Sequence, residues 1–209
     1  MFDTDFDGQK LMYHPVEVAE WLKNGITRGP IYTEMELYSG CNHDCIFCAI
    51  DYLRSGRPEI MDAGSAKRII GELLEIGNKA IMFSGHGEPL LNPEAGAIIK
   101  YASSLMSASV TTNGTMLDAD RIDLIDGLEW IRFSVNGCSP EIYSMVHKCA
   151  PRFFDLVTGN ISAAVRRKRE RKLKIVIGVQ TVLLRENYAG IVEAGRLFKE
   201  IGADYFSVK

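Results

Sequence analysis

The sequence predicts an α/β fold: a partial (β/α)6 barrel of the TIM type, built on parallel strands. From residue 31 to residue 209, short segments rich in β-branched and aromatic residues alternate with segments of helical periodicity. Regular alternation of this kind is typical of a parallel sheet with right-handed crossovers. The repeats are too few to close an eight-stranded barrel, so we expect the sheet to curl without closing. With 209 residues, 46% of them hydrophobic, the chain can form one domain with a sizeable core.

A short N-terminal extension, residues 1–30, precedes this repeat. Pro15 stands near the first turn of a predicted helix that ends at Lys23, and Gly25 follows it. The extension begins with an acidic stretch and shows no apolar region typical of a signal peptide. We expect it to pack against the bottom or the open edge of the barrel.

The barrel elements follow in strict order. Strands are predicted over residues 31–38, 80–83, 107–111, 130–135, 174–183 and 205–209. Helices are predicted between them, over residues 65–75, 95–105, 118–127, 153–170 and 188–201. Residues 31–209 therefore form the core domain. No helix follows the last strand to cover it, so we expect a core that is truncated after its sixth strand or that works with a covering partner.

Three cysteines cluster directly after the first predicted strand, in the run Cys41-Asn42-His43-Asp44-Cys45-Ile46-Phe47-Cys48. The C-x3-C-x2-C spacing lets three thiolates converge on one small inorganic centre, and Cys thiolates are the usual ligands of iron–sulfur clusters. Three ligands would leave one iron of a 4Fe–4S cluster open to another molecule. A zinc site with His43 or Asp44 as the fourth ligand is the alternative, although no second pair of ligands follows at a zinc-site spacing.

The cysteine run, with the aromatic Phe47 just before its last cysteine, resembles the cluster motif of the radical S-adenosylmethionine (radical SAM) superfamily. The resemblance extends over about residues 32–209. Within it, residues 143–161 are similar to members that carry a C-terminal auxiliary-cluster (SPASM-type) domain. Cys138 and Cys149 are too few to hold an auxiliary cluster of their own.

This resemblance implies an enzyme with two cofactors, a 4Fe–4S cluster and S-adenosylmethionine. Cys41, Cys45 and Cys48 would bind the cluster, whose open iron would bind S-adenosylmethionine, and Phe47 would pack against the adenine. Reductive cleavage of S-adenosylmethionine would then give a 5′-deoxyadenosyl radical that abstracts hydrogen from a substrate. The alternative, from another class, is a non-catalytic iron–sulfur or zinc-binding module.

A polar turn follows the second predicted strand, in the run Gly85-His86-Gly87-Glu88-Pro89. The glycines let the backbone pass close to a ligand, and an acid follows at once. The turn resembles the Gly-Glu-Pro element of the superfamily, which implies that Gly87 and Glu88 bind the amino group of S-adenosylmethionine. The common pattern there is Gly-Gly-Glu, and His86 stands in place of its first glycine. A solvated turn is the alternative.

The fourth predicted strand carries polar residues on one face. Period-two alternation places Arg132, Ser134 and Asn136 together, which indicates a wet cavity, since a strand buried on both faces should be apolar throughout. The resemblance implies that Ser134 and Asn136 contact the ribose or carboxylate of S-adenosylmethionine, although Asn136-Gly137 also reads as a turn. Gln180, an amide in the fifth strand, is a further candidate for a cofactor or substrate contact, or else a satisfied core amide.

Other polar residues allow two readings. Asn113, in the turn after the third strand, is expected to support the site. His43 and His86 lie in loops near the predicted cluster, as proton donors or as solvated residues. Arg166 stands on a helix from which related enzymes place a basic residue near the cofactor carboxylate. Cys149 is a hydrogen-atom relay or a small buried side chain.

The expected partners are a small-molecule or peptide substrate and an electron donor such as a flavodoxin or ferredoxin. Neither nucleic acid nor a membrane is expected, since the net charge is -3 and no apolar run is long enough to span a bilayer. The basic run at residues 166–174 closes a helix, where the helix dipole favours cations, although it also allows a nucleic-acid patch. The cysteine usage suits a reducing cytoplasm better than a disulfide framework.

Overall fold

A six-stranded parallel sheet, with its strands in chain order, forms the centre of the molecule. The computed structural model describes residues 12, 14–26, 29–50 and 57–209. The strands are β1 (Tyr32–Met35), β2 (Ala80–Phe83), β3 (Ser107–Thr112), β4 (Trp130–Ser134), β5 (Val176–Thr181) and β6 (Tyr205–Val208). The predicted α/β fold of the partial-barrel type is confirmed.

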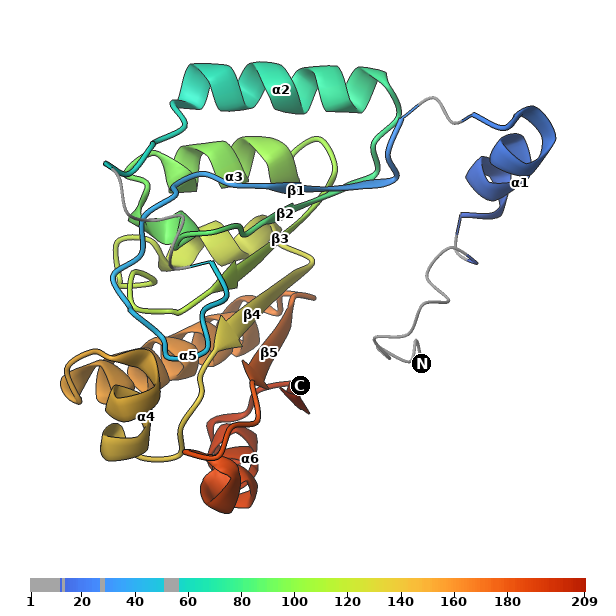
Figure 1. The fold of residues 1–209 in the computed structure, drawn as a ribbon. Helices are drawn as coiled ribbons and strands as arrows, with labels where there is room; N and C mark the ends of the chain where they lie inside the picture. The colour runs from blue at the N-terminus through green and yellow to red at the C-terminus, as the bar shows by residue number, and fades with distance from the viewer. Residues whose placement is uncertain (1–11, 13, 27–28, 51–56) are drawn as a thin grey trace.

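Helices α2 (Ala63–Glu75), α3 (Ala95–Ser103), α5 (Arg152–Arg171) and α6 (Ile191–Ile201) lie along the outer face of this curved sheet (Figure 1). Every second side chain along a strand points to this outer face and packs against the helices. Among these side chains, Ile81, Val110, Ile131 and Ile177 are fully buried. The regular 2.0-residue period of a strand sends the intervening residues to the opposite, inner face. The apolar core is therefore the layer between sheet and helices.

The inner face is hollowed and carries both polar and apolar residues. A cavity of about 670 Å³ opens on it, lined in part by Tyr32, Glu34, Ser109, Trp130 and Arg132. These residues come from strands β1, β3 and β4, so the hollow lies inside the curve of the sheet. Arg132 lines this cavity, whereas Ser134 and Asn136 do not, so a wet cavity shared by all three residues stays a prediction.

One helix is absent from the sequence prediction. α4 (Pro140–His147) forms between β4 and α5, where we expected no element. Its start has a clear sequence signal, because the Ser139 side chain accepts a hydrogen bond from the Ile142 backbone N–H at 3.4 Å and Pro140 occupies the first turn. Figure 1 shows α4 beside α5, beyond the carboxyl end of β4.

The helix predicted over residues 118–127 is instead a 3₁₀ helix, η4 (Ile122–Gly127). Asp118 Oδ1 accepts hydrogen bonds from the backbone N–H groups of Asp120 and Arg121, at 3.1 and 3.2 Å. Short acidic side chains compete in this way with the helical ladder and favour tight turns. Two further 3₁₀ turns, η3 (Pro89–Leu91) and η5 (Tyr188–Gly190), follow β2 and β5.

Helix α1 (Pro15–Asn24) stands apart from the helical layer, on the side of the sheet where the strands begin (Figure 1). Its Glu17 Oε1 lies 3.8 Å from Lys79 Nζ, just before β2. Residues 1–11, 13 and 27–28 of the predicted extension lie outside the described residues. The division into an extension (1–30) and a core (31–209) that is truncated after the sixth strand stays a prediction.

Candidate functional site

The three clustered cysteines lie in the loop that follows β1, and all are half-buried. The backbone N–H of Cys48 donates to the Cys45 carbonyl at 3.0 Å, which closes a tight turn. Burial, together with the nearby negative charges of Cys41 and Cys48, raises the pKa of the Cys45 thiol to about 12. The three sulfurs are thus close enough to repel one another as thiolates, a cost that a bound cation removes.

Two strand-end turns hold the start of this loop. The Glu88 backbone N–H donates to the Gly40 carbonyl at 2.8 Å, which brings the turn after β2 against the first cysteine. Asn113, after β3, donates through Nδ2 to Asn42 Oδ1 at 2.7 Å, and Asn42 Nδ2 donates to Thr115 Oγ1 at 2.8 Å. Through its hydrogen bond to Asn42, Asn113 could support the cysteine loop in the way the sequence predicts.

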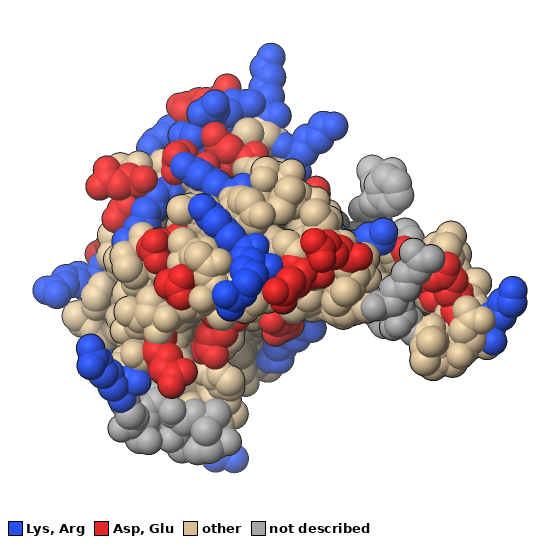
Figure 2. Space-filling model, turned by 90° about the horizontal axis from the view of Figure 1, so that it is seen from above, with Lys and Arg blue, Asp and Glu red and all other residues tan. Residues whose placement is uncertain are grey.

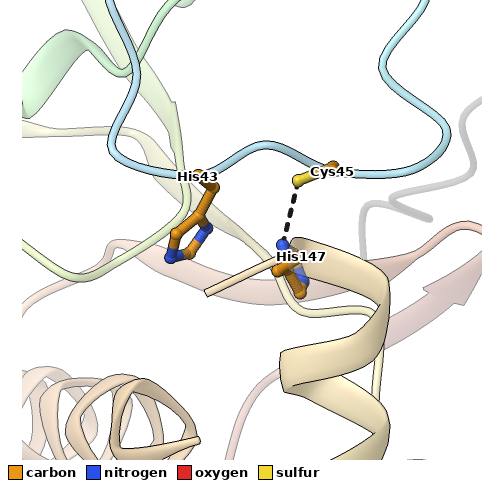
Figure 3. A group of neighbouring side chains, drawn as sticks. All are labelled: His43, Cys45 and His147. Carbon is orange, nitrogen blue, oxygen red and sulfur yellow. Dashed lines mark hydrogen bonds between the residues drawn. The ribbon is translucent and has the colours of Figure 1, made fainter. Parts of the chain in front are cut away.

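The end of α4 holds the middle of the loop. Asp44 N–H donates to the His147 carbonyl at 3.1 Å, and Ile46 N–H donates to the Val146 carbonyl at 2.9 Å. Cys45, between them, has its Sγ 3.1 Å from Nδ1 of His147 (Figure 3). The cysteine loop is therefore fixed on three sides, by the turns after β2 and β3 and by α4.

Gly87 is where the turn after β2 meets the cysteine loop most closely. A Cβ atom at this position would overlap the carbonyl oxygens of Tyr38 and Gly40. Only glycine permits this approach of two backbones. The predicted contact of Gly87 with S-adenosylmethionine stays a prediction, while its packing against the cysteine loop is a feature of the fold.

We expect Gly87→Ala to displace the cysteine loop, because the new methyl group meets backbone rather than a movable side chain. Overpacking of this kind costs about 1–3 kcal/mol, and iron uptake should fall with it. Chemical denaturation and iron analysis of the reconstituted chain would measure both effects. Gly96→Ala in α3 is the matched control, since a Cβ there meets nothing within 4 Å. Equal behaviour of the two variants would contradict the prediction.

Glu88 is buried, with 2% of its surface exposed, and its carboxylate already accepts three hydrogen bonds. The donors are Thr112 Oγ1 at 2.6 Å, Asn113 N–H at 2.7 Å and Leu90 N–H at 3.0 Å. Burial raises the pKa of this carboxyl group, and the hydrogen bonds oppose that effect. Glu88 thus joins the ends of β2 and β3. Its predicted contact with S-adenosylmethionine stays a prediction.

Glu36 is a site residue that the sequence analysis did not propose. Its Oε1 accepts hydrogen bonds from the backbone N–H groups of His86 and Gly87 at 2.9 and 3.2 Å, and its Oε2 lies 2.9 Å from Nδ1 of His86. The Glu36 carboxylate thus holds the turn after β2 in place through contacts with His86 and Gly87. The alternation along residues 31–38 places Glu34 and Glu36 on one face, and that was the signal available in the sequence.

Ser134 and Gln180 are direct neighbours on β4 and β5, and Gln180 is in register with Ser207 of β6. All three lie on the inner face near the carboxyl ends of their strands, and Ser134 and Gln180 are half-buried. Ligands of α/β barrels bind at this end of the strands. The two predicted cofactor contacts are therefore placed side by side, and contact itself stays a prediction.

Asn136 does not share the inner face with Ser134, because β4 ends at residue 134 and the alternation of faces stops before Asn136. Its side chain is 1% exposed. The Oδ1 atom accepts from Val182 N–H at 2.6 Å, and Nδ2 lies 3.2 Å from Nε2 of His147. Asn136 therefore ties the ends of β4 and β5 to α4, and its predicted contact with S-adenosylmethionine stays a prediction.

The remaining candidates separate into two groups. Phe47 is half-buried, and its ring centroid lies 6.4 Å from that of His147, at the edge of the site. His43 is buried, with its ring centroid 5.0 Å from that of His147. Arg166 is exposed on α5. Phe47 and His43, both in the cysteine loop, thus lie near His147 of α4, and the role of Arg166 stays a prediction.

The donor set fits an iron–sulfur cluster. It consists of three thiols on one tight loop, and backbone or imidazole N–H groups approach two of the sulfurs: His43 N–H lies 3.4 Å from Cys41 Sγ, and His147 Nδ1 lies 3.1 Å from Cys45 Sγ. Hydrogen bonds to cysteine sulfur are a regular feature of cluster sites. Cys138 and Cys149 lie partly buried against the apolar core, and Cys149 is near enough to contribute to the raised pKa of Cys45.

Comparison with known proteins agrees with this geometry. The Radical SAM superfamily model matches residues 35–198. An AdoMet-dependent heme synthase of Methanosarcina barkeri is 26% identical over 186 residues, which cover 88% of this chain and 51% of the relative. A probable GTP 3′,8-cyclase of Halobacterium salinarum is 29% identical over 138 residues, covering 63% of this chain and 38% of the relative. The chain thus spans about half or less of the length of these relatives.

Solved structures show the same fold. Streptococcus suis SuiB bound to precursor peptide SuiA aligns with 99% of this chain and 46% of its own, with a TM-score of 0.74 and 17% identity. SuiB bound to S-adenosylmethionine aligns with 100% of this chain and 45% of its own, with a TM-score of 0.71 and 17% identity. Because the family model matches most of the chain, this protein belongs to the radical SAM superfamily, whose members are enzymes that use a 4Fe–4S cluster and S-adenosylmethionine.

Proposed function

We propose that this chain holds a 4Fe–4S cluster on Cys41, Cys45 and Cys48 and binds S-adenosylmethionine beside it, at the carboxyl ends of the strands. The observation that carries the proposal is the convergence of three thiols on one loop that is clamped by the turns after β2 and β3 and by α4. When bound, the two cofactors supply reductive cleavage of the sulfonium carbon–sulfur bond, which yields a 5′-deoxyadenosyl radical able to abstract hydrogen from a substrate.

The chain's own residues position these groups. The clamped loop fixes where the thiolates point, and the Gly87 backbone packs against the carbonyls of Tyr38 and Gly40, just before the first cysteine. Ser134 and Gln180 offer a hydroxyl and an amide on adjacent strands, able to orient polar groups of S-adenosylmethionine. Phe47 supplies an apolar edge against which an adenine ring could pack. The protein contributes orientation and exclusion of water, and the cofactors contribute the chemistry.

The competing assignment is a zinc-binding module built on His43, Cys45 and His147, whose ligand atoms lie within 4.8 Å of one another (Figure 3). Coordination through Nδ1 of His147 would require its proton to sit on Nε2. The Asn136 backbone N–H already points at Nε2 from 3.1 Å, so two donors would face each other. The observed hydrogen bonding therefore opposes zinc at this position, and the family assignment opposes a non-catalytic module.

The proposal is tested by titrating S-adenosylmethionine into the reduced, cluster-loaded chain and following the EPR spectrum of the cluster. Direct coordination should change the spectrum, and the titration should saturate at one equivalent. A spectrum that does not respond at any concentration would leave an iron–sulfur protein without the proposed cofactor site.

Ser134→Ala and Gln180→Ala should keep the cluster and weaken binding of S-adenosylmethionine. A lost hydrogen bond to a charged ligand is worth about 1.5–3 kcal/mol, which is roughly ten- to a hundredfold in affinity. Calorimetry of the loaded variants measures this loss. Glu75→Ala, on the exposed end of α2, is the control that should leave affinity unchanged. Wild-type affinity in both strand variants would mean that the cofactor lies elsewhere.

The substrate belongs to this proposal as a class only. The relatives are named as heme synthase and GTP cyclase, and SuiB is described with a precursor peptide, so we propose a small-molecule or peptide substrate. Its place would be on the inner face of the sheet, where Arg132 lines a cavity. An electron donor such as a flavodoxin or ferredoxin would reduce the cluster.

We further propose that the chain does not bind nucleic acid and works in the cytoplasm. Three basic residues at the end of α5 form ion pairs, Arg167 and Arg171 with Asp126 at 2.6 and 3.2 Å and Lys168 with Asp204 at 2.6 Å. Figure 2 shows basic and acidic side chains interspersed on the face in view. No helix within the described ranges is long and apolar enough to cross a membrane. Cluster cysteines in thiolate form also suit a reducing compartment.

A further inference from the structure

His147 is a buried polar residue at the cysteine loop for which the sequence motifs give no role. It is the last residue of α4 and is 1% exposed. Its imidazole bridges two parts of the site. Nδ1 lies 3.1 Å from Cys45 Sγ (Figure 3), and Nε2 lies 3.1 Å from the backbone nitrogen of Asn136. The ring therefore connects the end of β4 to the middle cysteine.

The hydrogen-bonding partner of Nε2 decides which nitrogen carries the proton. A backbone N–H can only donate, so the Asn136 N–H requires Nε2 of His147 to accept. A neutral imidazole has one acceptor nitrogen and one N–H nitrogen. The proton therefore sits on Nδ1, and the contact with Cys45 is an N–H···S hydrogen bond in which His147 donates.

The backbone holds donor and sulfur at a fixed separation. The residues on either side of Cys45, Asp44 and Ile46, donate their N–H groups to the carbonyls of His147 and Val146. The ring of Tyr143, one turn earlier on α4, lies against the imidazole with centroids 4.1 Å apart and planes inclined by 32°. Neither the loop nor the ring can move away without breaking these contacts.

We propose that His147 is a positioning residue that donates a permanent hydrogen bond to the Cys45 sulfur and thereby raises the reduction potential of the cluster. The inference rests on the proposed function, since it needs the cluster on the three cysteines. Reduction adds negative charge that is shared with the cysteine sulfurs, and an N–H donor stabilises that charge most in a buried setting. Hydrogen bonds to the sulfurs are among the factors that set cluster potentials.

The test uses three substitutions that separate the two halves of the imidazole. His147→Asn places an amide nitrogen near the position of Nδ1 and keeps a donor for the sulfur. His147→Gln reaches the position of Nε2 and keeps an acceptor for the Asn136 N–H, but loses the donor to the sulfur. His147→Leu loses both. The readout is the midpoint potential of the cluster in the reconstituted 209-residue chain, from a redox titration followed by EPR without S-adenosylmethionine.

We expect His147→Asn to titrate close to the wild-type potential. In His147→Gln and His147→Leu the equilibrium constant for one-electron reduction should fall about tenfold, a shift of about 59 mV to more negative potential. A role limited to packing would instead group all three variants together, because each of them removes the imidazole ring. Equal potentials in all four proteins would overturn the inference.

A second measurement uses the wild-type chain and so tests the inference even if the His147 variants take up no cluster. With ¹⁵N-labelled histidine, pulsed EPR of the reduced cluster should detect a nitrogen coupled through the hydrogen bond, and the signal should persist in His43→Gln. Absence of the coupling in a loaded wild-type chain overturns the inference alone. A wild-type chain that takes up no cluster overturns the proposed function and this inference with it.

Discussion

Replacing Cys45 by alanine is expected to abolish loading of the 4Fe–4S cluster. The same holds for Cys41 and Cys48, because each thiolate would hold a different iron and two ligands cannot retain the cluster. Loss should be nearly complete for each, in contrast to the graded effects of surface substitutions. Iron and sulfide analysis after anaerobic reconstitution, with the EPR spectrum of the reduced protein, measures the outcome.

Two cysteines of the same chain serve as controls. Cys138 and Cys149 lie at the edge of the apolar core, and their replacement by alanine should leave iron content unchanged. Cys149 contributes to the raised pKa of Cys45, so it lies close enough to make this control a demanding one. Normal iron content in Cys45→Ala would remove the cluster assignment.

Glu88→Ala is expected to destabilise the folded chain strongly. The substitution leaves the buried donors Thr112 Oγ1, Asn113 N–H and Leu90 N–H without their acceptor. Each stranded buried donor costs about 1–3 kcal/mol, so the summed loss should reach at least about 3 kcal/mol. Urea unfolding of the chain without cofactors isolates this effect from ligand binding.

The matched comparison is Glu88→Gln. Its amide oxygen still accepts, but its NH₂ group faces donors, so the loss in stability should be intermediate between the alanine variant and wild type. Glu75→Ala, on an exposed helix surface, should stay within about 0.5 kcal/mol of wild type. If Glu88→Ala unfolds at the wild-type urea concentration, the carboxylate is not the structural link that its three hydrogen bonds indicate.

The cysteine variants and the Glu88 variants also separate two roles, cluster ligation and binding of S-adenosylmethionine. A cofactor contact made by Glu88 would appear as weaker binding of S-adenosylmethionine in a variant that remains folded, and Glu88→Gln is the substitution suited to show it. The cysteine variants report on cluster ligation whatever the role of Glu88. The cluster assignment and the role of Glu88 are therefore tested independently, and either can fail without the other.

The sequence by itself determined the features that depend on neighbouring residues. Period-two strands and amphipathic helices specify the order of the parallel sheet, since each element needs only its own apolar pattern to find the core. The spacing of Cys41, Cys45 and Cys48 likewise lies within one loop, so local geometry suffices to bring three thiols together. The polar face of Ser134 and Gln180 follows from the same alternation.

Only the tertiary structure decided the contacts that join distant segments. Cys45 and His147 are 102 residues apart in the sequence. Glu88 accepts a hydrogen bond from Thr112, which lies 24 residues further along the chain. Hydrogen bonds of this kind depend on where whole strands and helices end, and α4 ends at His147 because Lys148 turns the chain into the left-handed region at φ 47°. No periodicity encodes such a meeting, because it arises when separately specified elements pack and buried polar groups must find partners.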